Sequence, residues 1–242
     1  MMRILRNIFG TIKHKIYGGV IEMYVKELSS QCAEPVDIWR NVSNHNLLQL
    51  LYNDLSGRNF LFESYVQLCR LKMHTEAPPS DVQFIERSIQ NNRFVFIEAA
   101  HRDKLLSDPE YVVLCKWYDW ISANMDVSLD LIVYLQCPPE VAFQRMLSRG
   151  RSEEKSKIPL DYMKKIHDTY EDWLINQTFQ TSLPPVLVVN TEKDLSEVGE
   201  LCYKARDILC GKIKLTKPVT SLEMVVENIT KCYSFCNDCK LY

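Results

Sequence analysis

Acidic side chains and one arginine stand at the ends of two predicted strands, in the runs Glu34-Pro35-Val36 and Glu86-Arg87-Ser88. A carboxylate can take a proton from an attacking hydroxyl group, and a neighbouring guanidinium can offset its charge or hold phosphate oxygens. The residue before a proline is biased toward extended backbone, which favours a strand end at Glu34. The two runs therefore predict a site for proton transfer where neighbouring strands end.

A helical segment between these runs carries a second set of candidate side chains. Phe62, Val66 and Arg70 recur every four residues within the stretch from Asn59 to Met73, and Glu63 adjoins Phe62. Residues at this spacing lie on one side of a helix. Aromatic and aliphatic residues there usually belong to the core, whereas two long charged side chains do not. This face predicts one wall of a pocket for a flat, hydroxyl-bearing small molecule.

The elements that position these residues alternate between the two periods of regular structure. Residues 130–135 and 185–190 are predicted strands, since an unbroken apolar run follows Asp130 and another lies between Pro185 and Asn190, as expected of parallel strands covered on both faces. Asp-Pro at 108, Pro-Pro at 138 and Pro at 159 mark helix starts, and a closing helix is expected over 195–209. Strand–helix alternation predicts an α/β fold with a parallel sheet flanked by helices.

Composition excludes several classes of function. A chain of 242 residues with 46% hydrophobic residues can bury one sizeable core. Its formal charge of −2 does not favour binding to a nucleic-acid polymer. No uninterrupted apolar run reaches about 18 residues, which argues against membrane insertion. The nine cysteines are scattered and odd in number, which suits a reducing compartment better than a disulfide framework.

These motifs resemble those of the deoxynucleoside kinase family, most closely its mitochondrial thymidine kinase branch. Three runs carry the resemblance: Glu-Pro-Val-x-x-Trp-Arg-Asn from Glu34, Glu-Arg-Ser from Glu86, and Arg-x-Arg-Ser-Glu-Glu from Arg149. The likeness covers about residues 34–211 and is strong over 124–135 and 171–175. It implies a P-loop-kinase-like parallel sheet and the transfer of the γ-phosphate of ATP, with Mg²⁺, to the 5′-hydroxyl of a deoxynucleoside.

The resemblance assigns roles to the first set of residues. Glu34 would be the general base that takes the proton from the sugar 5′-hydroxyl, and Arg87 would sit beside it and steady phosphate oxygens. Trp39 would wall the sugar pocket. Glu86 would lie near the magnesium ion, usually through water. An alternative for Arg87 is a purely structural ion pair with Glu34.

The same resemblance places the nucleoside. Phe62 and Phe96 would sandwich the base, and Tyr52 and Glu154 would bind the sugar 3′-hydroxyl. The base-facing set comprises Phe62, Glu63, Val66, Arg70, Asn92 and Phe96.

Three positions of that set depart from the thymidine-type relatives. Glu63 stands where the family has glutamine, and Asn92 where those relatives have alanine or aspartate. Arg70 stands where the thymidine-type kinases have an apolar residue, and it is the residue that the deoxycytidine- and purine-type kinases use. An ionised Glu63 can only accept hydrogen bonds. The pocket is therefore expected to favour a base rich in donors, such as guanine with its O6 on Arg70, over thymine.

A charged loop resembles the family's lid, whose arginines close over the phosphates. The arginines concerned are Arg145, Arg149 and Arg151, ahead of Ser152-Glu153-Glu154. They would offset the charge of the phosphoryl group during transfer.

The loop that should cradle the phosphates has no match. The pattern G-x-x-x-x-G-K-[ST] lets backbone N–H groups, a lysine and a hydroxyl converge on phosphates and Mg²⁺ after a buried strand. Counting back from Glu34, Lys15 falls at the position of that lysine, without the glycine before it or the hydroxyl after it. No strand rich in valine or isoleucine is expected ahead of it, so Lys15 is at most a weak substitute.

The first residues suggest targeting instead. Isoleucine recurs every four positions from Ile4 to Ile16 among basic residues, with no acid before Glu22. Such a segment indicates a basic amphipathic helix, typical of a mitochondrial transit peptide.

These observations predict residues 1–33 as an atypical N-terminal segment, 34–211 as a deoxynucleoside kinase domain and 212–242 as a C-terminal tail. The leading hypothesis is a deoxynucleoside kinase, a homodimer by family analogy, in mitochondria or alternatively in the cytoplasm. The alternative is a non-catalytic protein that keeps the nucleoside pocket for binding or scaffolding. A third possibility is that the first 33 residues are an alternative or mistaken start joined to a kinase body.

Overall fold

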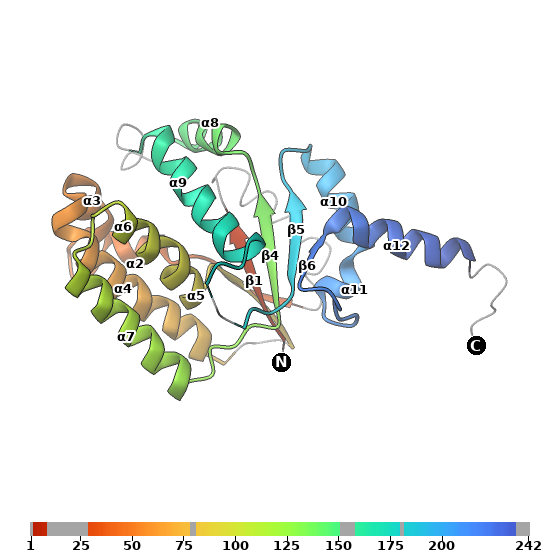
Figure 1. Ribbon diagram of the computed structural model, residues 1–242, viewed down its shortest axis with the longest axis horizontal. Helices are drawn as coiled ribbons and strands as arrows, with labels where there is room; N and C mark the ends of the chain where they lie inside the picture. Colours follow the sequence, from red (N-terminus) through yellow and green to blue (C-terminus); the bar gives the residue numbers. More distant parts are fainter. Residues whose placement is uncertain (1, 9–28, 78–80, 151–157, 180–181, 236–242) are drawn as a thin grey trace.

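A single parallel sheet organises the protein. The computed structural model describes residues 2–8, 29–77, 81–150, 158–179 and 182–235. Within these ranges the sheet has six strands in the order β2-β3-β1-β4-β5-β6. The strands are β1 (Met2–Ile8), β2 (Ser29–Cys32), β3 (Val82–Glu86), β4 (Leu131–Gln136), β5 (Val186–Asn190) and β6 (Val219–Ser221). Every neighbouring pair is parallel, so all carboxyl ends meet at one edge, the upper edge in Figure 1.

Helices cover both faces of this sheet (Figure 1). Those that build the site are α2 (Val36–Arg40), α3 (Leu47–Asn53), α4 (Leu55–Thr75), α5 (Ile89–Asn91), the π-helix η1 (Asn92–Ile97), α6 (Glu98–Arg102), α8 (Pro139–Arg149) and α9 (Leu160–Tyr170). The others are α7 (Asp108–Asn124), the π-helix η2 (Glu171–Ile175), α10 (Leu195–Lys204), α11 (Arg206–Leu209) and α12 (Leu222–Phe235). The α/β class predicted from strand–helix alternation is confirmed, and the arrangement is that of a P-loop-kinase-like fold.

Local signals in the sequence fix where these helices begin and end. The side chain of Asp54 caps α4 by accepting from the Gly57 amide at 2.9 Å. Ser107 and Glu110 form a capping box at the start of α7, with a proline between them in the first turn. Gly150 ends α8 with φ of 71°, a left-handed conformation that glycine adopts without a steric penalty.

Strand β4 divides the core in two. Leu131, Val133 and Leu135 face a cluster completed by α10 and α12, whereas Ile132 and Tyr134 face a cluster completed by η1, α8, α9 and η2. This alternation follows from the two-residue period of a strand, and burial on both faces explains the unbroken apolar sequence.

The N-terminal expectation was wrong for residues 2–8. They form β1, which lies between β3 and β4 in register Ile4 to Phe84 and Ile4 to Leu131. A four-residue repeat of isoleucine fits a strand as well as a helix, and the arginines between them concealed the strand. The segment that follows, residues 9–28 with Lys15, lies outside the described residues.

Part of the predicted C-terminal tail belongs to the sheet. Strand β6 pairs with β5, and Leu222, Val225 and Val226 of α12 are buried in the core beside β5. Residues 219–230 therefore belong to the folded domain, and the boundary expected at residue 212 is wrong for them. Among the described residues, no helix is long and apolar enough to cross a membrane.

Candidate active site

Glu34 and two arginines meet where β2 and β3 end. Arg87 donates from Nη1 to both carboxylate oxygens of Glu34, at 2.7 Å and 3.0 Å. Arg70 donates from Nη2 to Oε1 of Glu34 at 2.9 Å. The three side chains are mostly enclosed, with exposed fractions of 9% for Glu34, 3% for Arg70 and 19% for Arg87. The meeting of Glu34 and Arg87 is what the two sequence runs predicted.

The backbone at the end of β3 sets the direction of Arg87. Its φ is 59°, in the left-handed region that non-glycine residues seldom occupy. Directly after it, the Ser88 hydroxyl caps α5 by accepting from the Asn91 amide at 3.1 Å. Glu86 accepts at 3.4 Å from the backbone N–H of Glu34, which ties the end of β2 to the end of β3. Backbone strain of this kind is typical of functional positions.

Arg70 binds Glu34 but does not line the cavity. Besides Glu34, its guanidinium donates to the Ser88 carbonyl and the Asn91 side chain, both at 3.0 Å. Burial lowers the pKa of Arg70, an effect that Glu34 opposes. Arg70 therefore holds Glu34 in place and does not line the cavity in front of it, so the expected contact with a guanine O6 is not available in this structure.

A cavity of about 400 Å³ opens in front of Glu34. This volume is within the usual range for small-molecule sites. Of the predicted site residues, Glu34, Trp39, Tyr52, Phe62, Glu63, Arg87, Phe96 and Arg149 line it. The Trp39 and Phe62 rings pack edge to face, with centroids 5.5 Å apart, and the Arg87 guanidinium lies 4.9 Å from the centroid of Phe96. The aromatic side chains of the cavity therefore lie beside the Glu34 carboxylate and the Arg87 guanidinium that binds it.

Val66 and Asn92 support this lining from the second layer of side chains. Val66 is buried in a cluster with Trp39 and Phe62. Asn92 donates its side-chain N–H to Oε2 of Glu63. Both Asn92 and Phe96 belong to the π-helix η1 and are four residues apart, a spacing that places two side chains on the same side of a helix.

Glu63 is enclosed at the cavity wall, with 6% of its surface exposed. Burial raises its pKa to about 7, with a further increase from Glu34 and decreases from Arg70, the Asn92 hydrogen bond and Arg87. Near neutral pH Glu63 is therefore only partly ionised, because an enclosed carboxylate loses its hydration, and the base preference expected for an ionised Glu63 stays a prediction.

The lid arginines divide into three cases. Arg149, at the end of α8, lines the cavity. Arg145 does not line it and instead donates to the Thr191 carbonyl at 2.8 Å and to Cys137 Sγ at 3.2 Å. Arg151 and Glu154 lie outside the described residues.

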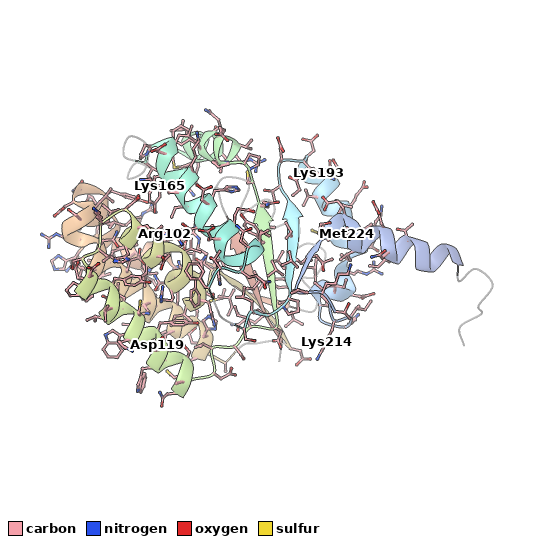
Figure 2. The ribbon with its side chains drawn as sticks, viewed as in Figure 1. Arg102, Asp119, Lys165, Lys193, Lys214 and Met224 are labelled. Atoms are coloured by element: carbon pink, nitrogen blue, oxygen red, sulfur yellow. The ribbon has the colours of Figure 1, made fainter. Side chains whose placement is uncertain are left out.

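Several lining residues were missed by sequence reasoning. Lys165 of α9, which is labelled in Figure 2, pairs with Asp103, which follows α6, at 2.8 Å. The pair joins two elements that border the cavity. Tyr162 of α9 and Asn59 of α4 also line it. Tyr162 stood within a predicted helix face and could have been proposed from that face, whereas no local signal in the sequence pairs Lys165 with Asp103.

A sequence model of the deoxynucleoside kinases matches residues 20–204, well over half of the chain. The chain belongs to the deoxynucleoside kinase family. Mitochondrial thymidine kinase 2 of Homo sapiens is 44% identical over 174 residues, which are 72% of this chain and 65% of that kinase. The deoxycytidine kinase of Mus musculus is 30% identical over 206 residues, covering 73% of this chain and 79% of that kinase. A probable deoxycytidine kinase of fowlpox virus is 31% identical over 163 residues, covering 66% and 68%.

The match to the deoxynucleoside kinase family covers part of this chain and part of its relatives. The chain spans somewhat less than two thirds of the length of the thymidine kinases that it matches. Strand β1 lies outside the family match, which begins at residue 20, although it pairs with β3 and β4 inside the sheet. The cavity and the Glu34 cluster both fall within the matched residues.

Proposed function

We propose that this protein is a deoxynucleoside kinase that transfers the γ-phosphate of ATP to the 5′-hydroxyl of a deoxynucleoside. The observation that carries the proposal is the Glu34 carboxylate, bound by Arg70 and Arg87 and exposed to an aromatic cavity. A flat base fits between aromatic side chains, and a sugar hydroxyl can reach a carboxylate at the same wall.

In this proposal Glu34 takes the proton of the 5′-hydroxyl as that oxygen attacks phosphorus. Arg87 keeps the carboxylate aimed into the cavity, since one guanidinium nitrogen contacts both of its oxygens. Phe62 and Phe96 hold the base, and Trp39 and Tyr52 enclose the sugar. Arg70 positions Glu34 from the far side, away from the ligand.

The phosphate side of the site is less complete. ATP with Mg²⁺ supplies the transferable phosphoryl group and neutralises part of its charge. Arg87 and Arg149 line the cavity, and in this proposal their guanidinium groups face phosphate oxygens. The described residues include no group of three or more His, Cys, Asp or Glu that could hold a metal ion. The proposed role of Glu86 near the metal rests on family resemblance.

The test compares the full chain with Glu34→Gln in phosphorylation assays and in nucleoside binding by calorimetry. Turnover should fall about 10²–10⁴-fold, the usual effect of losing a general base, while nucleoside affinity stays close to that of the parent. Glu110→Gln, on the outer helix α7, is the matched control and should leave both unchanged. Equal turnover of Glu34→Gln and its parent would refute the role of Glu34.

One observation favours a second candidate, a non-catalytic nucleoside-binding protein. The sequence contains no G-x-x-x-x-G-K-[ST] pattern, and phosphoryl transfer depends on positioned donors around the phosphates. Nucleoside binding without turnover, in both the full chain and Glu34→Gln, would favour this candidate.

We also propose that two copies of the chain associate. Helices α4 and α7 lie side by side and expose Leu61, Leu68, Val113, Trp117 and Trp120, with 57% of Trp117 and 55% of Trp120 accessible. Asp119, on the same stretch of α7, lies at the outer edge of the molecule in Figure 2. Such a patch is larger than isolated exposed residues and suits an interface.

Light scattering tests the dimer. The parent should have twice the mass of one chain, and Trp117→Glu should shift it toward one chain. Ile213→Glu, at a similarly exposed apolar residue elsewhere, should not. A parent with the mass of one chain would refute the dimer.

A mitochondrial location is the remaining proposal, and it is supported by the similarity of the chain to mitochondrial thymidine kinases. Imaging of the chain fused at its C-terminus to a fluorescent protein tests it. Signal confined to the cytoplasm would refute it.

A further inference from the structure

Glu63 presents one free oxygen to the cavity. Its Oε2 accepts from Asn92, and among the described residues no hydrogen bond holds Oε1. Because an N–H can only donate, Asn92 requires Oε2 to be an acceptor. Any proton on the carboxyl group therefore belongs on Oε1. Oε1 is a donor when Glu63 is neutral and an acceptor when it is ionised.

We propose that the protonation state of Glu63 selects the base of the nucleoside, with Asn92 fixing which oxygen changes its role. This inference rests on the proposed nucleoside site and names the property that chooses among its ligands. A neutral Glu63 offers the Oε1 hydroxyl as a donor and the second lone pair of Oε2 as an acceptor, the pair that a glutamine amide offers. An ionised Glu63 offers acceptors only.

The charges around Glu63 allow both states near neutral pH. Arg70 on its own helix, Arg87 after β3 and the Asn92 amide favour the ionised form. Burial and Glu34, which follows β2, favour the neutral form. Tyr162 faces it from α9, and Asp103, Asp161 and Lys165 also line the cavity from the α6 and α9 side. The resulting pKa of about 7 places the change of state within the working range of an enzyme.

The edges of the bases respond differently to this change. Thymine offers N3–H next to the O4 carbonyl, and therefore pairs with a donor and an acceptor. Against an ionised Glu63, O4 would face a negative acceptor, which leaves a polar group repelled inside the cavity. Guanine pairs with the neutral form through N1–H and O6, and with the ionised form through N1–H and its N2 amine. Thymidine should therefore require neutral Glu63, whereas deoxyguanosine should bind in both states.

The expected effect follows from the fraction of neutral Glu63. If thymidine binds only the neutral form, its dissociation constant rises about tenfold between pH 6 and pH 8 for a pKa near 7. The dissociation constant of deoxyguanosine should not rise over that range. The ratio of the two affinities therefore shifts by about tenfold or more toward deoxyguanosine.

The experiment is calorimetric titration of the full chain with thymidine and with deoxyguanosine at pH 6, 7 and 8. Glu63→Gln is the matched variant, since it keeps the size and the donor–acceptor pair of the neutral side chain but cannot ionise. In that variant the ratio of affinities should not depend on pH. A ratio in the parent that stays constant across pH, or one that changes equally in Glu63→Gln, would overturn the proposal.

A second readout needs no ligand and separates this inference from the proposed function. Infrared difference spectra between the parent and Glu63→Gln should show a band of a protonated carboxyl group at pH 6 that disappears by pH 8. Absence of the band at pH 6 overturns the inference even if nucleosides bind. If the band titrates and neither nucleoside binds either protein, the proposed nucleoside site is refuted, and base selection falls with it.

Discussion

Replacing Glu63 with glutamine preserves the shape of a buried side chain and removes its ability to ionise. Burial raises the pKa of Glu63 from 4.5 to about 7, so the folded protein holds a proton that the unfolded chain releases. Between these values the folded state binds more protons, and the stability of the parent must fall as the pH rises. The loss is complete above pH 7, and below pH 4.5 both states are protonated and no loss remains.

The magnitude follows from the two pKa values. At about 1.36 kcal/mol for each unit between them, ionising Glu63 costs roughly 3 kcal/mol of folding free energy at pH 8. This free energy is not reduced for solvent screening, because the Glu63 side chain is almost fully enclosed. For a chain of this size, 3 kcal/mol corresponds to a difference of roughly 6–12 °C in melting temperature.

The assay is urea unfolding of the parent, Glu63→Gln and Glu76→Gln at pH values from 4.5 to 8. Glu76 follows α4 and is exposed, so its variant controls for the loss of one carboxylate from the same part of the chain. Glu63→Gln should match the parent at pH 4.5 and exceed it by about 3 kcal/mol at pH 8. If the curves of all three proteins stay parallel across this range, Glu63 is ionised in the folded state at its ordinary pKa and the reasoning fails.

Two further predictions concern the Glu34 cluster and the phosphate side. Arg70→Met should lower the free energy of unfolding by about 3–5 kcal/mol, because Glu34 loses a buried partner. The control Arg102→Met, at a 43% exposed side chain, should lower it by at most about 1 kcal/mol. Similar losses for both variants in urea unfolding would contradict this. The triple variant Phe9→Gly, His14→Gly, Ile16→Ser carries the pattern G-x-x-x-x-G-K-S directly after β1. Its turnover should be about 10⁴ times that of the parent if the pattern supplies two electrostatic contacts to the phosphates. Parent turnover within tenfold of this variant would show that no such contacts were missing.

The sequence was sufficient for the parallel sheet and for the meeting of Glu34 with Arg87. Parallel strands end at one edge, so residues that follow neighbouring strands must approach each other, here to 2.7 Å. The aromatic cavity wall was predictable for a similar reason. Phe62 and Glu63 lie on a long helix whose period is visible in the sequence, and both line the cavity.

What the sequence did not reveal depends on contacts between distant segments. A helical pattern gives the direction of Arg70 but not its partner, and three-dimensional packing turns it toward Glu34, Ser88 and Asn91. Strand β1 could not be predicted because its segment contains two arginines, which are unusual in a strand inside a sheet. Its pairing with β3 and β4 depends on segments far away in the sequence. The pKa of Glu63 depends on burial by α4, η1 and α9, which no local pattern encodes.

A crystal structure of the full chain with a bound deoxynucleoside would show whether Glu34 can act on the sugar hydroxyl. We expect the base between Phe62 and Phe96 and the sugar 5′-oxygen within hydrogen-bond distance of the Glu34 carboxylate, with Arg70 and Arg87 still bound to that carboxylate. A nucleoside bound in this cavity with its 5′-oxygen turned away from Glu34, or bound elsewhere on the molecule, would contradict this expectation.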